Sequence, residues 1–191
     1  MSAYIKNIII IGPVGAGKST QGQLVAEALN KASISLDNIA NKYYETNGFK
    51  PPDFQEARKQ KGYLEAYRQW WPSLAYAAQQ VLKDYSNSVI DFGAGHSHYE
   101  DELLLASVEE SLSKCENIVL LLPCADLDRS IFLLRQSSLQ QRKRDWIHDG
   151  YDFIEHWVKD DCNHRLSTTT IYTEGKTPEQ TRDEILNGII I

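Results

Sequence analysis

One short stretch near the N-terminus carries residue types that can hold the phosphates of a nucleotide. It fits the pattern G-x-x-x-x-G-K-[S/T] and consists of Gly12, Pro13, Val14, Gly15, Ala16, Gly17, Lys18, Ser19 and Thr20. Glycines let the backbone wind closely around a polyphosphate, so that successive N–H groups point at its oxygens. Lys18 would reach the β- and γ-phosphates, and the Ser19 hydroxyl would ligate Mg²⁺. The stretch predicts a phosphate loop, at about residues 12–19, that binds ATP with Mg²⁺.

Two aspartates come at the ends of short apolar runs and supply carboxylates for phosphoryl transfer. Asp37 follows the strand predicted over 33–36, and we expect it to orient an acceptor hydroxyl and accept its proton. It also fits the N-cap of a helix starting near Asn38. Asp91 ends a strand expected beside that of the phosphate loop, so its carboxylate would approach the Mg²⁺. A buried, hydrogen-bonded aspartate is the other interpretation of Asp91.

Small residues follow the same predicted strand as Asp91. Gly93, Ala94 and Gly95 would lie at its carboxyl end, where open α/β sheets bind ligands. Side chains of this size let a substrate approach the backbone closely, so we predict that the three residues contact the substrate. A plain tight turn has the same composition and stays open as an alternative.

The segment from Tyr43 to Tyr85 is unusually aromatic and also holds several cations. It contains Trp70 and Trp71 and most of the tyrosines. Aromatic walls with a few guanidinium groups suit an organic acceptor that bears a ring, a carboxylate or a phosphate. Arg58 and Arg68 are the predicted anchors for such a group. The aromatics fit a core between helices equally well, with the cations on a solvated face.

Strands and helices alternate along the chain. Tyr4–Ile11 is an almost continuous apolar run, as expected for a parallel strand covered on both faces. Further strands are predicted over 33–36, 88–92, 117–122 and 168–173, with helical patterns between them. The last helix would begin with Thr177 as its N-cap and Pro178 in its first turn. The alternation predicts an α/β protein with a three-layer αβα fold around a parallel sheet.

The amino-acid composition indicates which classes of binding partner to expect. The chain has 191 residues, 42% of them hydrophobic, and a formal net charge of −6. An acidic balance argues against nucleic-acid binding, and no run approaches the roughly 20 apolar residues of a membrane span. Three cysteines without CxxC spacing indicate neither a disulfide framework nor a zinc ribbon. We expect a cytoplasmic protein whose partner is a small-molecule acceptor, with no nucleic-acid or membrane partner; the sequence does not set the oligomeric state.

Taken together, the motifs resemble those of the shikimate kinase group among the nucleoside-monophosphate-kinase-like P-loop enzymes. The likeness is strong over residues 5–31 and looser over most of the chain. Ser35-Leu36-Asp37 stands where that family has Asp-x-Asp, and Gly93-Ala94-Gly95 where it has three glycines. The family holds Mg²⁺ partly through its first aspartate, so with Ser35 in that place the metal would depend more on Ser19 and Asp91.

The resemblance also implies an architecture for residues 1–191 as one P-loop kinase-like domain. It implies a five-stranded parallel sheet of order 2-3-1-4-5, a helical substrate-binding region at about 38–85 and a lid at about 124–150. Arg135 and Arg142 fall in this lid, where closure could bring an arginine to the transferring phosphoryl group. Charges on a solvated helix face are the simpler interpretation of these residues. Asn163, His164 and Arg165 are a further predicted substrate contact.

The leading functional prediction is ATP- and Mg²⁺-dependent phosphoryl transfer to a small hydroxylated metabolite, as in shikimate kinases. A nucleoside or nucleotide kinase, with a base stacked among the aromatics, is one alternative. A nucleotide-dependent ATPase switch that binds a protein partner is another, because the phosphate loop fixes the nucleotide and not the reaction.

Overall fold

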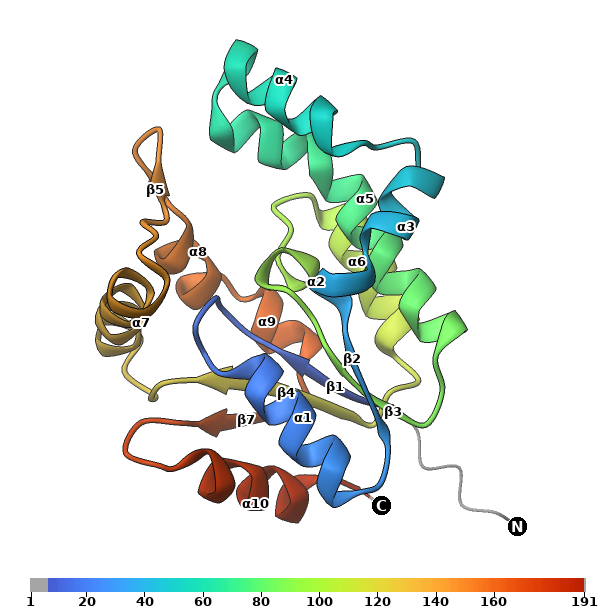
Figure 1. Cartoon of the computed structure of the whole chain (residues 1–191), viewed down its shortest axis with the longest axis vertical. Coiled ribbons are helices and arrows are strands. Elements are labelled where there is room, and N and C mark those ends of the chain that lie inside the picture. The colour runs from blue at the N-terminus through green and yellow to red at the C-terminus, as the bar shows by residue number, and fades with distance from the viewer. Residues whose placement is uncertain (1–6, 191) are drawn as a thin grey trace.

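A central sheet of five parallel strands organises the computed structural model, which describes residues 7–190 (Figure 1). The strands are β1 (Ile8–Ile11), β2 (Ala32–Ser35), β3 (Ser88–Asp91), β4 (Asn117–Leu122) and β7 (Thr169–Tyr172), in the order β2-β3-β1-β4-β7. The predicted α/β class with a parallel sheet is confirmed. The predicted fifth strand is β7, because β5 (Ile147–His148) and β6 (Tyr151–Asp152) form a separate antiparallel hairpin that the sequence analysis did not predict.

Strand β1 is the buried centre of the sheet. It pairs with β3 on one side and β4 on the other, and all four of its isoleucines are fully buried. Burying one such side chain stabilises the fold by about 1.5–3 kcal/mol relative to exposure. The apolar run that predicted this strand begins at Tyr4, but residues 4–6 lie outside the described part of the chain.

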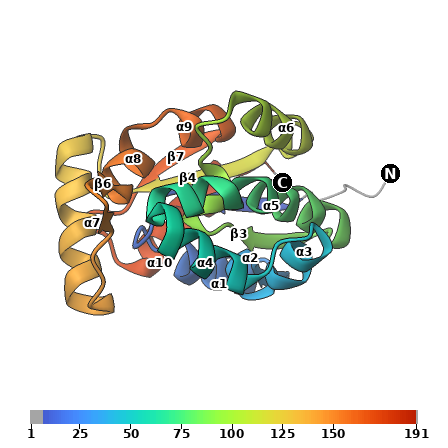
Figure 2. The ribbon, with the colours of Figure 1, turned by 90° about the horizontal axis from the view of Figure 1, so that it is seen from above.

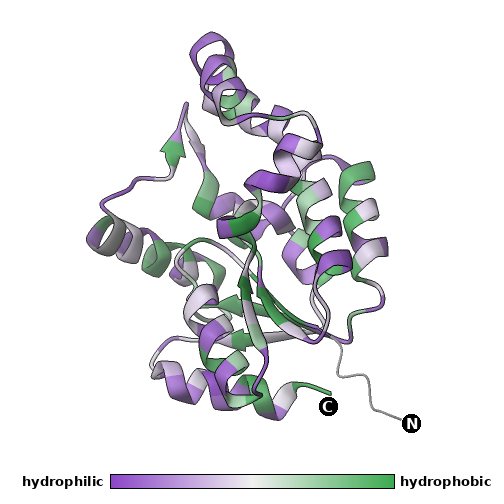
Figure 3. Cartoon of the chain, turned by 45° about the vertical axis from the view of Figure 1, so that its right-hand side comes forward, coloured by the Kyte–Doolittle hydropathy of each residue, from purple (hydrophilic) through white to green (hydrophobic). Residues whose placement is uncertain are grey.

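Helices cover both faces of the sheet. Helix α1 (Lys18–Ala28) and helix α10 (Pro178–Gly188) pack together on one face, while α6 (Glu102–Leu112) and α9 (Cys162–Leu166) lie on the other (Figure 2). Helix α10 starts as predicted, with Thr177 as its N-cap and a capping box completed by Gln180. Hydrophobic residues concentrate in the strands between these layers (Figure 3).

A group of helices lies beyond the carboxyl ends of β2 and β3. Strand β2 leads into α2 (Leu36–Ile39), and β3 into the 3₁₀ helix η1 (Ala94–Ser97). The helices α3 (Asn41–Thr46), α4 (Pro51–Lys61) and α5 (Tyr63–Asp84) form the aromatic region, and α4 with the start of α5 extends away from the sheet (Figure 1). Helix α5 also packs against α6 and η1.

The β5–β6 hairpin stands opposite this helical region, between α7 (Leu127–Arg142) and α8 (Phe153–Lys159). Its tip is tied to the start of α5, since the Asp149 carboxylate accepts a hydrogen bond from the backbone N–H of Tyr63. The ring of His148 also stacks on that of Tyr63, with centroids 4.1 Å apart. Gly62 joins α4 to α5 with φ +88°, and a Cβ there would lie 2.8 Å from the Asp149 carboxylate. The hairpin is therefore docked on the α4–α5 junction.

Across residues 7–190, every helix is too short or too polar to cross a lipid bilayer.

Candidate functional site

The phosphate loop joins β1 to α1 and has the backbone that its glycines permit. Gly12, Gly15 and Gly17 have φ values of +135°, +83° and +93°. A Cβ at Gly12 would come within 2.5 Å of the carbonyl oxygen of Leu121 in β4, so only glycine fits there. Helix α1 begins at Lys18 and directs its first N–H groups at the loop, which is the geometry of an anion site.

A cavity of about 110 Å³ lies within this loop, and we call it the phosphate-loop cavity. It is lined by Val14, Gly15, Gly17, Lys18, Ser19, Thr20, Asp37, Asp91 and Ala94. Among the other predicted loop residues, Pro13 accepts a hydrogen bond from the buried Lys18 ammonium at 2.9 Å through its carbonyl oxygen. Gly12, Pro13 and Ala16 shape the turn but do not line the cavity.

Oxygen atoms from three elements converge beside the loop. The hydroxyls of Ser19 and Ser35 donate hydrogen bonds to the same carboxylate oxygen of Asp91, at 3.0 and 3.3 Å. Asp91 is only 3% exposed, and its burial raises its pKa, while the Ser19 hydrogen bond and the Lys18 charge oppose that rise. A set of hydroxyl and carboxylate oxygens suits Mg²⁺, which prefers oxygen ligands and retains several waters. The residues at this point fit the metal that the sequence predicted.

Asp37 lies in the first turn of α2, directly after β2, with a side chain that is 65% exposed. It lines the phosphate-loop cavity and also a second, larger cavity. Gly93 lies beneath it, and a Cβ there would lie 1.8 Å from Oδ1 of Asp37. Gly93 therefore makes room for the Asp37 carboxylate, whereas Ala94 and Gly95 line the larger cavity.

His96 is a site residue that the sequence analysis did not identify. Its ring is fully buried; Nδ1 faces Oδ1 of Asp37 at 3.5 Å, and Nε2 lies 2.7 Å from the hydroxyl of Tyr44. Burial lowers the pKa of His96 to about 4, so the ring is neutral near pH 7. With one proton, the matching tautomer carries it on Nδ1, toward Asp37, and accepts the Tyr44 hydroxyl at Nε2. The only sequence signal was its place directly after Gly95.

The larger cavity measures about 310 Å³, and we call it the aromatic cavity. Its aromatic lining residues are Tyr44 of α3, Tyr63, Tyr67 and Trp70 of α5, Trp146 before β5, and Phe153 and Trp157 of α8. Val14, Asp37 and Ala94 line both cavities, so the two spaces adjoin at Asp37. The aromatic segment of the sequence forms one wall, and the segment around the hairpin forms the other.

Comparison with known proteins agrees with this architecture, although no protein-family profile matches the chain. A shikimate kinase from Sulfurihydrogenibium sp. (strain YO3AOP1) is 24% identical over 186 residues, covering 97% of this chain and 98% of the relative. The solved shikimate kinase from Acinetobacter baumannii, in complex with shikimate, has a TM-score of 0.64 at 19% identity and covers 95% of this chain and 91% of its own. The chain has the P-loop kinase fold.

Other solved P-loop kinases support the same assignment. Shikimate kinase from Aquifex aeolicus has a TM-score of 0.56 at 18% identity, with 95% of this chain and 94% of its own covered. A gluconokinase from Sinorhizobium meliloti has a TM-score of 0.53 at 17% identity, with 97% and 91% covered. The predicted resemblance to small-molecule P-loop kinases is thereby confirmed, at the level of the fold.

Within this P-loop kinase fold, the cations predicted as acceptor anchors lie elsewhere. Arg58 is exposed over the ring of Tyr63, and Arg68 pairs with Glu100 at 2.6 Å; neither lines the aromatic cavity. Successive residues of a helix point about 100° apart, so Arg68 faces away from the cavity that Tyr67 lines. Among the described side chains, the guanidinium that lines the cavity is that of Arg144, which stacks over Trp146 at 4.0 Å.

The two arginines predicted in the lid, Arg135 and Arg142, belong to helix α7. Arg135 forms ion pairs with Asp152 and Glu155, which tie α7 to the hairpin and to α8, and it lines neither cavity. Arg142 ends α7, and its side chain lies outside the described part of the structure.

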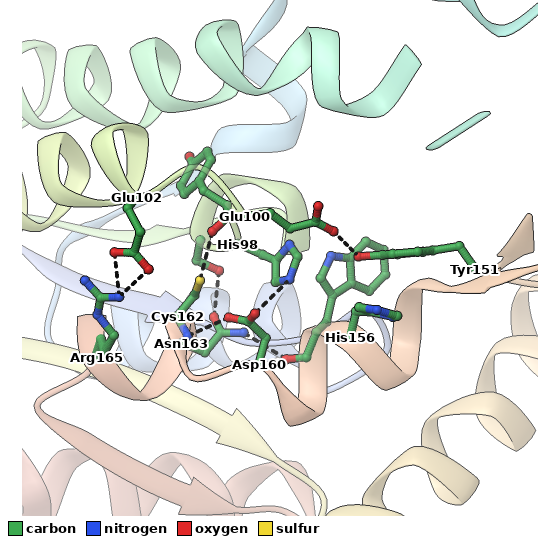
Figure 4. Close-up of polar contacts among 12 residues, drawn as sticks. His98, Glu100, Glu102, Tyr151, His156, Asp160, Cys162, Asn163 and Arg165 are labelled. Carbon is green, nitrogen blue, oxygen red and sulfur yellow. Dashed lines mark hydrogen bonds and ion pairs between the residues drawn. The ribbon is translucent and has the colours of Figure 1, made fainter. Parts of the chain in front are cut away.

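Residues 163–165 were predicted to contact the substrate, but the side chains of Asn163 and Arg165 bond to neighbouring helices. The Asn163 side chain accepts a hydrogen bond from the Ser97 hydroxyl and donates one to the carbonyl oxygen of Trp157. Figure 4 shows Arg165 paired with Glu102 of α6. His164 is exposed on α9. None of the three lines the phosphate-loop cavity or the aromatic cavity.

Proposed function

We propose that the protein transfers the γ-phosphoryl group of ATP to a hydroxyl group of a small molecule held in the aromatic cavity. The observation that carries this proposal is the place of Asp37, which lines both that cavity and the phosphate-loop cavity. A carboxylate at this junction stands where an acceptor hydroxyl would meet the end of a triphosphate. The fold shared with solved shikimate kinases and a gluconokinase supports the same reaction type.

The donor would be held by the phosphate loop. The N–H groups of residues 14–19 and the Lys18 ammonium supply positive partners for the β- and γ-phosphates. Ser19 and Asp91 would hold Mg²⁺, with the Ser35 hydroxyl at the same carboxylate. When bound, the ion would offset the charge that the phosphoryl oxygens carry during transfer.

The acceptor would be activated by Asp37. As the acceptor oxygen bonds to the γ-phosphorus, the bond to the β-phosphate oxygen breaks, ADP leaves and the hydroxyl proton passes to the Asp37 carboxylate. Neutral His96 presents Nδ1 to the carboxylate at 3.5 Å without adding a charge. Aromatic walls exclude water, which would otherwise compete for the phosphoryl group.

Two variants separate donor binding from transfer. Calorimetry should detect Mg·ATP binding, and Mg·ATP at about 100 times its Kd should stabilise the protein by about 2.7 kcal/mol in urea unfolding. Lys18→Ala should abolish both effects. Asp37→Asn should keep both but lower kcat by a factor of about 10² to 10⁴ in a coupled assay of ADP release, because it removes the proton acceptor.

The matched controls are Lys114→Ala and Glu45→Gln, which remove the same charges at exposed positions away from both cavities. Both should behave as the unmodified protein. Binding of Mg·ATP without ADP release for any hydroxylated acceptor would contradict the proposal and favour a nucleotide-dependent switch.

A further inference from the structure

The charge of the aromatic cavity limits what it can hold. Among the described residues that line it, Asp37 and Arg144 are the only ones charged near neutral pH, because burial keeps His96 neutral. Asp37 lies at the phosphate-loop end and belongs to the transfer step. Arg144 is partly engaged by the ring of Trp146. The lining therefore offers at most one cation to an anionic group on the acceptor.

The remaining lining favours the faces of a flat ring. Seven aromatic side chains and Leu74 surround the space, and they come from α3, α5, α8 and the segment before β5. Aromatic rings pack well against other ring faces and edges, whereas an acceptor with a hydroxyl on every carbon needs a polar partner for each. Because these residues come from elements that are distant in the sequence, the apolar surface surrounds the cavity and does not lie along one helix only.

Several buried polar groups in the lining lack a hydrogen-bond partner within residues 7–190: the indole N–H groups of Trp70, Trp146 and Trp157, the Tyr67 hydroxyl and Nδ1 of His96. The Tyr67 hydroxyl lies beside the Trp157 indole, and Nδ1 of His96 faces Asp37. The indole N–H groups of Trp70 and Trp146 have no such neighbour among the described residues and are the two donors left for an occupant. An indole N–H can only donate a hydrogen bond. A hydrocarbon ring would leave both unpaired, whereas a ring nitrogen or carbonyl oxygen on the occupant would accept them.

We infer that the phosphoryl acceptor is a heteroaromatic alcohol: a flat ring with nitrogen or oxygen acceptor atoms, joined to an arm that carries the reacting hydroxyl, as in a nucleoside. The ring lies among the cavity aromatics with its acceptor atoms toward Trp70 and Trp146, and the arm reaches Asp37. This inference rests on the proposed phosphoryl transfer and narrows its substrate.

Matched pairs of acceptors test the ring requirement in the full chain with Mg·ATP. Adenosine, cytidine and pyridoxine carry a heteroaromatic ring. Ribose has the hydroxyls of a nucleoside without the base, and benzyl alcohol has a ring without acceptor atoms. Shikimate and gluconate have no aromatic ring. We expect saturable ADP release, with a phosphorylated product in mass spectrometry, from at least one heteroaromatic alcohol. Ribose, benzyl alcohol, shikimate and gluconate should each give a kcat/KM at least 100-fold lower.

Two variants then test the donors. Trp70→Phe and Trp146→Phe keep a ring and remove the N–H, so each should raise KM for the heteroaromatic acceptor about tenfold and leave KM for ATP unchanged. Trp71→Phe is the control, because Trp71 has a buried indole that does not line the cavity. Equal KM values in all three variants would overturn the assignment of the donors.

The outcomes distinguish this inference from the function on which it rests. Efficient phosphorylation of shikimate, gluconate or ribose, with none of the heteroaromatic alcohols turned over, overturns the inference and upholds phosphoryl transfer. Quenching of tryptophan fluorescence by adenosine or pyridoxine that saturates, without ADP release, supports the ring-binding cavity and overturns phosphoryl transfer. If no probe causes either quenching or ADP release, both the inference and the proposed phosphoryl transfer are overturned.

Discussion

Asp37, Gly93 and His96 are fitted to one another at the scale of single atoms. Gly93 has φ −61°, which any residue can adopt, so its backbone does not require glycine. Glycine is required here because a Cβ at this position would overlap the Asp37 carboxylate. On the other side, His96 faces the same carboxylate and is itself fixed by Tyr44. The Asp37 carboxylate therefore lies between the space that Gly93 leaves and the neutral ring of His96.

We therefore predict that Gly93→Ala disables transfer without unfolding the protein. The new methyl group should displace the Asp37 carboxylate by an ångström or more, which lowers kcat about 100-fold, while KM for ATP stays the same. Steady-state kinetics measure both values. Gly188→Ala, at a position with open space near the end of α10, should leave kcat unchanged. A normal kcat in Gly93→Ala would show that Asp37 does not act from this position.

At the scale of elements, α5 and the segments that flank the hairpin form two sides of the aromatic cavity. The link between the hairpin and α5 is narrow: Asp149 accepts the N–H of Tyr63, and His148 stacks on the Tyr63 ring. Tyr151 adds a hydrogen bond to Glu100 at 2.8 Å, and Glu100 also pairs with Arg68 of α5. These contacts hold the segment with Arg144 and Trp146 beside the cavity, and we propose that this segment serves as the lid.

Cutting this link should weaken acceptor binding alone. Asp149 has φ +55°, so Asp149→Gly removes the carboxylate without straining the backbone. We expect KM for the acceptor to rise about tenfold, since one charged hydrogen bond is worth about 1.5 kcal/mol, and KM for ATP to stay constant. Lys143→Gly is the matched control, because Lys143 also has positive φ, at +49°, and makes no contact with the hairpin tip in the described structure. An equal rise in both KM values would indicate general loosening.

At the scale of the whole molecule, buried histidines link stability to pH. The pKa of His96 falls from its ordinary 6.5 to about 4 because its ring is buried, and burial also lowers the pKa of His98. Above pH 6.5 the ring is neutral in both the folded and the unfolded chain. Between pH 6.5 and pH 4 only the unfolded chain takes up the proton, so the free energy of unfolding decreases as the pH falls.

We predict that His96 alone removes about 3 kcal/mol of stability between pH 7.5 and pH 4, at about 1.4 kcal/mol per pKa unit. Urea unfolding at several pH values measures this loss. His96→Gln should show a flatter dependence over the same interval, whereas His164→Gln, which changes an exposed histidine, should follow the unmodified protein. Parallel curves for the unmodified chain and His96→Gln would contradict the burial of a neutral His96. The raised pKa of Asp91 acts in the opposite direction, because the folded carboxyl group takes up its proton at a higher pH than the unfolded one.

The sequence by itself determined the phosphate loop, the buried strand before it and the parallel α/β class. These features are set by contiguous residues: glycines that allow positive φ, an apolar run covered on both faces, and a capped last helix. It also indicated Asp37 and Asp91, because the carboxyl ends of parallel strands meet at one edge of the sheet.

Only the tertiary structure decided what surrounds Asp37. It placed His96 against that carboxylate, brought Arg144 and Trp146 to the cavity, and left Arg58 and Arg68 on the outer side of their helices. The physical reason is that a side chain's neighbours depend on which face of its element is covered and by what. Residues 44, 67, 96, 146 and 157 come from five separate segments, and no local pattern states that these segments pack around one space.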